Sequence, residues 1–133
     1  MSQIPMVSKL DKERLLGSLT ASGTPPAYIK NLLEMIKTAI PVDPTQVPSE
    51  LVTMNSVVQI QDTETDEIDI YALVYSKDYN HQPEWISVES KLGSILLGRS
   101  IGDEIEIPSK PSSHTVRIIG IDYQPERAGH FDR

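Results

Sequence analysis

Apolar side chains recur at helical spacing in the first forty residues. One face of a first helix would carry Leu15, Leu16 and Leu19, because residues three or four apart share a helical face. A second stripe comprises Ile29, Leu32, Leu33, Ile36 and Ile40. The intervening "ASGTPPAY" contains one glycine and two prolines, which interrupt a helix. The pattern therefore predicts two short helices that form an antiparallel hairpin.

The start of the first helix carries a candidate capping box, Ser8 followed three residues later by Asp11. In such a box the hydroxyl and the carboxylate each accept a hydrogen bond from a backbone N–H that has no helical partner. Each arm would have about 12–16 residues and extend only about 20 Å, because a helix rises about 1.5 Å per residue. The hairpin would then be a truncated coiled coil.

Residues 41–50, "PVDPTQVPSE", hold three prolines. Proline fixes φ and lacks a backbone N–H, so we expect this segment to be a stiff connector. The expected organisation is a helical hairpin with its linker at residues 1–45, followed by a separate domain at residues 46–133.

From Leu51 onward the apolar period changes to two, which is typical of strands with one buried face. Two such runs flank the polar turn "DTETDE": Val52, Met54, Val58 and Ile60, then Ile68, Ile70, Ala72 and Val74. Further strands are expected at "WISV", "DEIEI" and "HTVRIIGID", with a short helix around Leu92–Leu97 that is closed by Gly98. The order β-β-β-α-β-β predicts an α+β domain with one short helix on a curved, mainly antiparallel sheet.

Composition narrows the class of protein. Hydrophobic residues make up 38% of the 133 residues, enough for a packed core. The formal net charge of −7 argues against non-specific nucleic-acid binding, which needs lysine and arginine to displace counterions. The chain has no cysteine, which excludes disulfides and thiolate sites. No apolar run approaches the roughly 20 residues of a membrane span, and the N-terminus does not read as a signal peptide. We expect a cytoplasmic protein.

Neither the acidic residues nor the histidines form a recognisable site. The acidic run comprises Asp62, Glu64, Asp66, Glu67 and Asp69; it lacks the ligand spacing and the glycine of a calcium loop, so we interpret it as a solvated hairpin turn. The three histidines, His81, His114 and His130, lie in separate segments without metal-type spacing. A histidine-based triad assembles in space and stays open at this point. We expect no catalytic residue, metal or cofactor.

The step "ESKL" between the third strand and the short helix stands out. Ser90 is placed to be the N-cap of that helix, because serine side chains accept hydrogen bonds from the first helical N–H groups. A cap lies at an exposed helix entrance, so Glu89, Ser90 and Lys91 would be presented together on a rigid element. This pattern favours a partner-binding surface.

Two stretches carry a family resemblance. "LVTMNSVVQIQDTETDEIDIYALVY" and "ISVESKLGSILLGRSIGDEIEI" resemble the C-terminal domain of the Gre family of bacterial transcript-cleavage factors, including its pattern S-x-x-S-P-L-G-x-A-L-L-G-x-x-x-G-D. The resemblance is greater to the Gre relative called regulator of nucleoside diphosphate kinase, which has an abbreviated N-terminal hairpin and ends much like "DYQPERAG". It covers about residues 47–129, and the sequence departs from the family pattern at Lys91 and Ile95.

The resemblance implies an FKBP-like fold for residues 46–133 and docking on RNA polymerase at the rim of its secondary channel. The polymerase contact of Gre factors falls on the step that Glu89, Ser90, Lys91 and Leu92 occupy here. Gre factors also insert a long coiled coil whose acidic tip helps to hold a magnesium ion for RNA hydrolysis.

The tip acids are missing from this chain. Between Arg14 and Glu34 it has no aspartate or glutamate, and its tip reads "SGTPP". Magnesium prefers carboxylate and other hard oxygen ligands, so the expectation is a polymerase-binding regulator that competes with other secondary-channel factors without stimulating cleavage.

Two alternatives stay open. One is an interaction module for another cytoplasmic protein, with the helical hairpin as its interface. The other is a peptidyl-prolyl isomerase, which an FKBP-like fold suggests. That enzyme needs an aromatic-lined apolar pocket, for which one tryptophan and one phenylalanine are little material.

Overall fold

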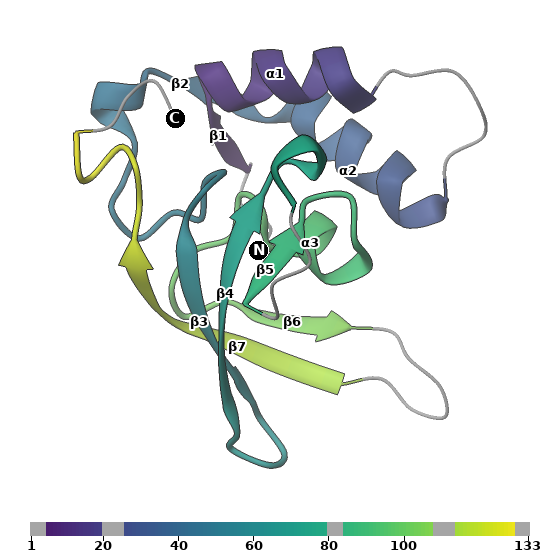
Figure 1. The fold of residues 1–133 in the computed structure, drawn as a ribbon, viewed down its shortest axis with the longest axis vertical. Helices are drawn as coiled ribbons and strands as arrows, with labels where there is room; N and C mark the ends of the chain where they lie inside the picture. The colour runs from purple at the N-terminus through teal and green to yellow at the C-terminus, as the bar shows by residue number, and fades with distance from the viewer. Residues whose placement is uncertain (1–4, 20–25, 80–83, 108–113, 130–133) are drawn as a thin grey trace.

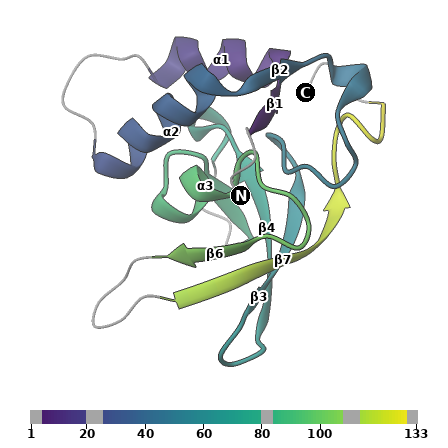
Figure 2. The ribbon, with the colours of Figure 1, turned by 180° about the vertical axis from the view of Figure 1, so that it is seen from behind.

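The computed structural model describes residues 5–19, 26–79, 84–107 and 114–129. Its elements are β1 (Met6–Ser8), α1 (Lys9–Leu19), α2 (Ala27–Thr38), β2 (Ile40–Val42), the 3-10 helix η1 (Pro44–Gln46), β3 (Val57–Asp62), β4 (Ile68–Val74), the 3-10 helix η2 (Ser76–Asp78), β5 (Trp85–Ser87), α3 (Lys91–Leu96), β6 (Glu104–Ile107) and β7 (His114–Tyr123). Helices α1 and α2 lie over one end of a curled sheet (Figure 1). The view from behind places α3 beside α2 (Figure 2).

Five strands form the main sheet in the order β5-β4-β3-β7-β6. All neighbours run antiparallel except β4 and β5, which are parallel. Val58 and Ile60 of β3 are buried, whereas Gln59 between them is opposite Ile70 and Gly120 on the other face. This alternation is the period of two in the sequence, and the predicted α+β class with a mainly antiparallel sheet is confirmed.

The helices and the sheet share one hydrophobic core. A single cluster contains Leu15 of α1, Leu32 and Ile36 of α2, and Val58 and Leu73 of the sheet. Full burial of one such side chain stabilises a fold by about 1.5–3 kcal/mol. The apolar stripes predicted for the two helices are therefore used to hold the helices on the sheet.

The structure contains a pair of short parallel strands that the sequence did not predict. Strands β1 and β2 pair with Met6 opposite Ile40. Ile40 was predicted to end the apolar stripe of the second helix, but that helix ends at Thr38 and Ile40 is 47% exposed. The prediction was wrong because Ala39 is already extended, with φ −68° and ψ 146°, and leads into β2. The proline-rich connector likewise contains part of β2 and all of η1.

Only half of the predicted capping box forms. The hydroxyl of Ser8 accepts a hydrogen bond from the Asp11 N–H at 3.0 Å. The carboxylate of Asp11, which the box would direct at the Ser8 N–H, instead accepts from the Met54 N–H at 3.0 Å and from the Tyr75 hydroxyl at 3.2 Å. A tertiary contact thus replaces the local one and ties the start of α1 to the sheet domain.

Three expectations stay predictions: the division at residues 45 and 46, the FKBP-like description and the antiparallel hairpin. Helices α1 and α2 contact each other, and the Lys12 ammonium near the start of α1 donates to the Ala39 carbonyl just beyond α2. The joining residues 20–25, with most of the "SGTPP" tip, lie outside the described residues. No helix in the described part of the chain is both long and apolar enough for a membrane span.

Candidate interaction site at the entrance of helix α3

The turn from β5 into α3 is closed by Ser90. Its φ of −77° and ψ of 161° are extended, and its hydroxyl accepts a hydrogen bond from the Gly93 N–H at 3.0 Å. The same hydroxyl donates to the Ser87 carbonyl at 2.6 Å. The predicted N-cap role of Ser90 is confirmed, and the cap fixes the direction in which the chain enters the helix.

Two further serines hold Glu89 in place. The Glu89 N–H donates to the Ser87 hydroxyl at 3.0 Å, and the Glu89 carboxylate accepts from the Ser76 hydroxyl. The Ser76 and Ser87 hydroxyls are themselves 2.6 Å apart. Sequence reasoning missed Ser76 because it belongs to η2, and no spacing relates that element to the α3 entrance.

A close approach of the backbone makes Gly93 necessary. A Cβ atom at this position would lie 2.0 Å from the Ser87 carbonyl oxygen and 2.9 Å from the Ser90 hydroxyl. Real Cβ atoms do not tolerate such distances to backbone, so any side chain here would displace the cap. The glycine in "ESKLG" is thus part of the site's construction.

The step predicted as the partner contact lies at the surface. Glu89 and Lys91 are exposed, while Ser90 and Leu92 are half-buried. Leu92 packs against the hydrophobic core cluster. The four residues therefore form a rigid, accessible corner, which we call the α3 corner. Its exposure is compatible with the predicted contact, and the contact itself stays a prediction.

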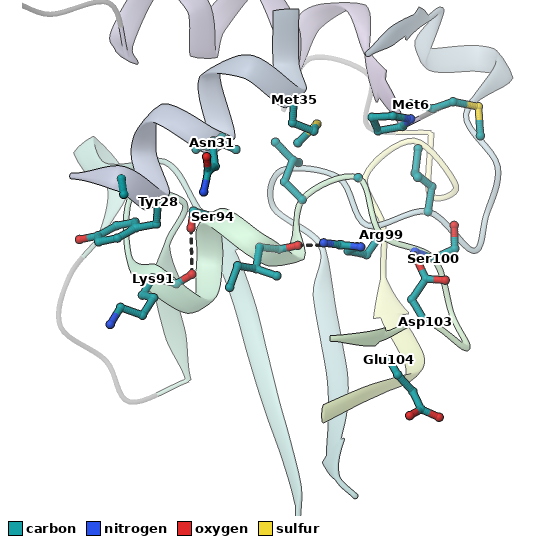
Figure 3. Close-up of a pocket in the computed structure, with 17 residues that line it drawn as sticks. Met6, Tyr28, Asn31, Met35, Lys91, Ser94, Arg99, Ser100, Asp103 and Glu104 are labelled. Carbon is teal, nitrogen blue, oxygen red and sulfur yellow. Dashed lines mark hydrogen bonds between the residues drawn. The ribbon is translucent and has the colours of Figure 1, made fainter. Parts of the chain in front are cut away.

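A groove runs from the α3 corner between α2 and α3, with a volume of about 1070 Å³. At one end Tyr28 of α2 lies near Lys91 and Asn31 points toward Ser94, and Arg99 lies farther along the groove (Figure 3). Ile95, where the sequence departs from the family pattern, lines the groove and also packs on the core. Sequence reasoning did not predict this groove, because it depends on how two helices distant in sequence pack together.

The carboxyl group of Asp11 is buried, and its pKa is strongly raised. Burial, together with the nearby charge of Glu126, raises the pKa of Asp11 to about 7, although the hydrogen bond from the Met54 N–H acts in the opposite direction. Burial and the neighbouring Asp11 also raise the pKa of Tyr75. The two side chains meet where the start of α1 joins the sheet, and the Tyr75 hydroxyl donates to the Asp11 carboxylate there.

The acidic run forms the predicted turn between β3 and β4, where the Asp62 carboxylate accepts from the Glu64 and Thr65 N–H groups. Within the described residues no group of three or more His, Cys, Asp or Glu side chains could hold a metal ion. His114 lies on β7 with its Nδ1 3.8 Å from the Asp62 carboxylate, and His81 and His130 lie outside the described residues.

The comparison with known proteins gives a consistent answer. The family model "Transcription elongation factor, GreA/GreB, C-term" matches residues 47–123. The regulator of nucleoside diphosphate kinase of Escherichia coli K12 is 31% identical over 131 residues, which cover 95% of this chain and 94% of that protein. Transcription elongation factor GreA of Clostridium beijerinckii is 34% identical over 93 residues, but the match spans only 58% of that relative's length.

A solved structure extends the likeness to the whole fold. The prokaryotic transcription elongation factor GreA/GreB from Nitrosomonas europaea superposes with a TM-score of 0.80 at 36% identity, covering 92% of this chain and 100% of that one. The "VTMNS" and "ESKLG" segments that suggested the resemblance both lie inside the matched range of the family model. The chain therefore belongs to the family defined by the C-terminal domain of the transcription elongation factors GreA and GreB.

Proposed function

We propose that this protein is a non-catalytic regulator of transcription that binds bacterial RNA polymerase. It docks at the rim of the secondary channel through Glu89, Ser90, Lys91 and Leu92. It competes there with other factors of the channel and does not stimulate transcript cleavage. The observation that carries the proposal is the α3 corner, which combines accessibility with a fixed geometry in a chain of the GreA/GreB family.

The hydrogen bonds of the corner support a docking role. Ser90 fixes the backbone through its bonds to Gly93 and Ser87, and Ser76 orients the Glu89 carboxylate. A partner that binds such a surface loses little conformational entropy on the side of this protein, because the backbone of the turn and the side chains of Ser90 and Glu89 are already held in place. Exposed lysine and glutamate side chains then supply orientation and specificity.

The helical arm supports the non-catalytic half of the proposal. Helices α1 and α2 have 11 and 12 residues, so each extends only about 16–18 Å at about 1.5 Å per residue. Their apolar faces pack in the core. The absence of aspartate and glutamate between Arg14 and Glu34 leaves the tip without the carboxylates that a second magnesium ion would need.

Neither alternative gains a specific observation. An interface on the helical hairpin would use its apolar faces, but Leu15, Leu32 and Ile36 are already buried in the core. An isomerase pocket would present several aromatic rings to a proline, whereas the described lining of the groove offers one, Tyr28.

Competition for core RNA polymerase tests the proposal. Unlabelled wild-type protein is expected to displace fluorescently labelled GreA from Escherichia coli core polymerase. Lys91→Glu, which reverses an exposed charge and leaves the Ser90 cap intact, is expected to displace it poorly. Failure of the wild-type protein to bind polymerase would remove the proposal. If the single variants Lys91→Glu and Ser90→Arg both displace labelled GreA as well as wild type does, the contact with polymerase lies elsewhere on the protein.

A stalled elongation complex tests the negative half. With GreA the nascent RNA is expected to be cleaved in the presence of magnesium. Saturating amounts of this protein should leave the rate of RNA cleavage at its intrinsic value. Stimulated cleavage would show that the argument from the missing tip carboxylates is wrong.

A further inference from the structure

We propose that the first half of β4 is an open sheet edge that binds an extended segment of a partner protein, in which apolar residues alternate with lysine or arginine. The segment adds to the main sheet as a further strand. This surface does not depend on the proposed function. It begins at Ile68 beside the β3–β4 turn, which lies at the opposite end of the molecule from α1 and α2 (Figure 1).

The open edge is also separate from the α3 corner. The chain enters α3 after Ser87, which is opposite Val74 at the end of β4. The step from Ile68 to Val74 is about 20 Å, at about 3.3 Å per residue of strand. A partner on the open edge therefore leaves the α3 corner accessible.

The strand that covers this side of β4 is short. β5 pairs only with Ala72–Val74, whereas β3 on the other side pairs with Ile68–Ala72. No strand in the described part of the chain therefore covers the outer edge of β4 from Ile68 to Tyr71. An uncovered strand edge is a template for pairing with another chain.

The backbone groups of Ile68 and Ile70 point to this edge. Within a strand, the N–H and C=O of one residue point to the same side, and successive residues alternate. The Ala72 N–H donates at 2.7 Å to the carbonyl that precedes β5, whereas the Leu73 N–H donates at 3.0 Å to the carbonyl that precedes β3. The alternation places the N–H and C=O of Ile68 and Ile70 on the β5 side, where they offer the main-chain hydrogen bonds that strand addition uses.

The side chains at the edge add an apolar contact. Ile68 is 53% exposed and Ile70 is 45% exposed. They share a face of β4 with Val74, which is buried, because side chains of alternate residues point to the same face. That face is buried toward the end of β4 and open at its start. A partner strand with apolar residues on this face would cover both isoleucines.

Charge decides what the other face of the partner strand carries. Asp69 lies on the opposite face of β4, Glu67 precedes the strand, and Glu84 precedes β5 beside the open edge; all three are exposed. None of their carboxylates forms an ion pair with a described residue. Lysine or arginine at alternate positions of the partner complements these acids. A second copy of this chain would bring the same acids to the edge, so it fits poorly.

NMR titration of the isotope-labelled full-length protein with a synthetic peptide tests the proposal. The peptide alternates valine with lysine over about ten residues, enough to span the open half of the strand. Its addition is expected to shift the backbone amide signals of Ile68 to Tyr71. A peptide that alternates valine with glutamate should bind about tenfold or more weakly, because its carboxylates meet the acids of the edge. Equal binding of the two peptides, or no shift at residues 68–71 with millimolar peptide, would overturn the proposal.

Two methylated peptides test whether the main chains pair. In an added strand every second N–H points to β4 and the others point to solvent. One peptide carries methyl groups on all valine nitrogens and the other on all lysine nitrogens, so each lacks one of the two sets of donors. One of them should bind about tenfold or more weakly than the other, since several hydrogen bonds are lost. Equal affinities of the two would contradict strand addition.

Charge reversal on the protein tests the acids. Asp69→Lys should weaken binding of the valine–lysine peptide by about fivefold or more. Glu13→Lys is the matched control, because Glu13 is exposed on α1, and it should stay within about twofold of wild type. Amide signals that match wild type away from position 69 would show that Asp69→Lys is folded. Equal losses in the two variants, or a wild-type dimer that Asp69→Lys alters in sedimentation, would overturn the assignment of this edge to a basic partner strand.

Discussion

The carboxylate of Asp11 accepts a hydrogen bond from the backbone N–H of Met54 at 3.0 Å, across 43 residues of sequence. Both residues are fully buried. This contact joins the first turn of α1 to the segment just before β3, so the attachment of the helical arm depends on an ionisable group inside the core.

The raised pKa of Asp11 predicts that the free energy of unfolding falls as the pH rises toward neutrality. Burial raises the pKa of Asp11 from 3.8 to about 7 in the folded state. A raised pKa means that this stabilising contribution is fully present below about pH 4 and is lost as the pH rises through 7. The loss is on the order of a few kcal/mol, because each pKa unit corresponds to about 1.4 kcal/mol.

Asp11→Asn isolates this effect. The amide can accept from the Met54 N–H and donate to the Tyr75 hydroxyl oxygen, as the protonated acid can, but it does not ionise. Urea unfolding at pH 4.5 and pH 7.5 should show that the variant gains stability relative to wild type at the higher pH. Comparing the free energies of unfolding of the two proteins at each pH cancels the contribution of the other titrating groups. If the variant and wild type differed by the same amount at both pH values, the assignment would be contradicted.

Gly93→Ala is expected to destabilise the protein by about 1–3 kcal/mol, since the new methyl group would overlap the Ser87 carbonyl and displace the cap. Polymerase binding should weaken with it, because the α3 corner changes shape. Thermal unfolding and the competition assay measure the two effects.

Gly17→Ala is the control for the same chemical change. Nothing lies within 4 Å of a Cβ at Gly17, which is in the interior of α1. Alanine favours a helix over glycine by about 1 kcal/mol, so this variant should be more stable than wild type and bind polymerase unchanged. If Gly93→Ala were as stable as Gly17→Ala, the overlap at Gly93 would be relieved without cost.

Ser76→Ala separates binding from stability. The Ser76 hydroxyl holds the exposed Glu89 carboxylate from a neighbouring element. Its removal should change stability by no more than about 0.5 kcal/mol, as is usual at the surface, while polymerase affinity falls several-fold because Glu89 becomes mobile. Urea unfolding and equilibrium binding check the pair of outcomes; unchanged affinity would mean that Glu89 needs no orientation.

The sheet and the Ser90 cap were predictable because each rests on local chemistry. Residues such as Val58 and Ile60 alternate with polar neighbours, and the buried face of β3 follows from that period. Ser90 precedes the short apolar helix at the position where a hydroxyl satisfies its first N–H groups. In both cases the sequence pattern that indicates the structure lies within a few residues.

Features that depend on long-range packing were not predictable. The carboxylate of Asp11 fits a capping box in sequence, but its partners in space are Met54 and Tyr75. Ile40 continues a helical stripe in sequence, but pairing with β1 places it in a strand. The groove arises only when α2 packs beside α3, so no sequence motif predicts it.

Photo-crosslinking from the α3 corner tests the central claim most directly. In one variant a photoreactive residue replaces the exposed Lys91, and in a second variant it replaces the exposed Glu64. Glu64 is in the turn between β3 and β4, which lies at the opposite end of the molecule from α1 and α2 (Figure 1). On illumination with core RNA polymerase, the probe at position 91 should form a crosslink to the polymerase and the probe at position 64 should not. No crosslink from position 91, or equal crosslinks from both positions, would contradict docking through this corner.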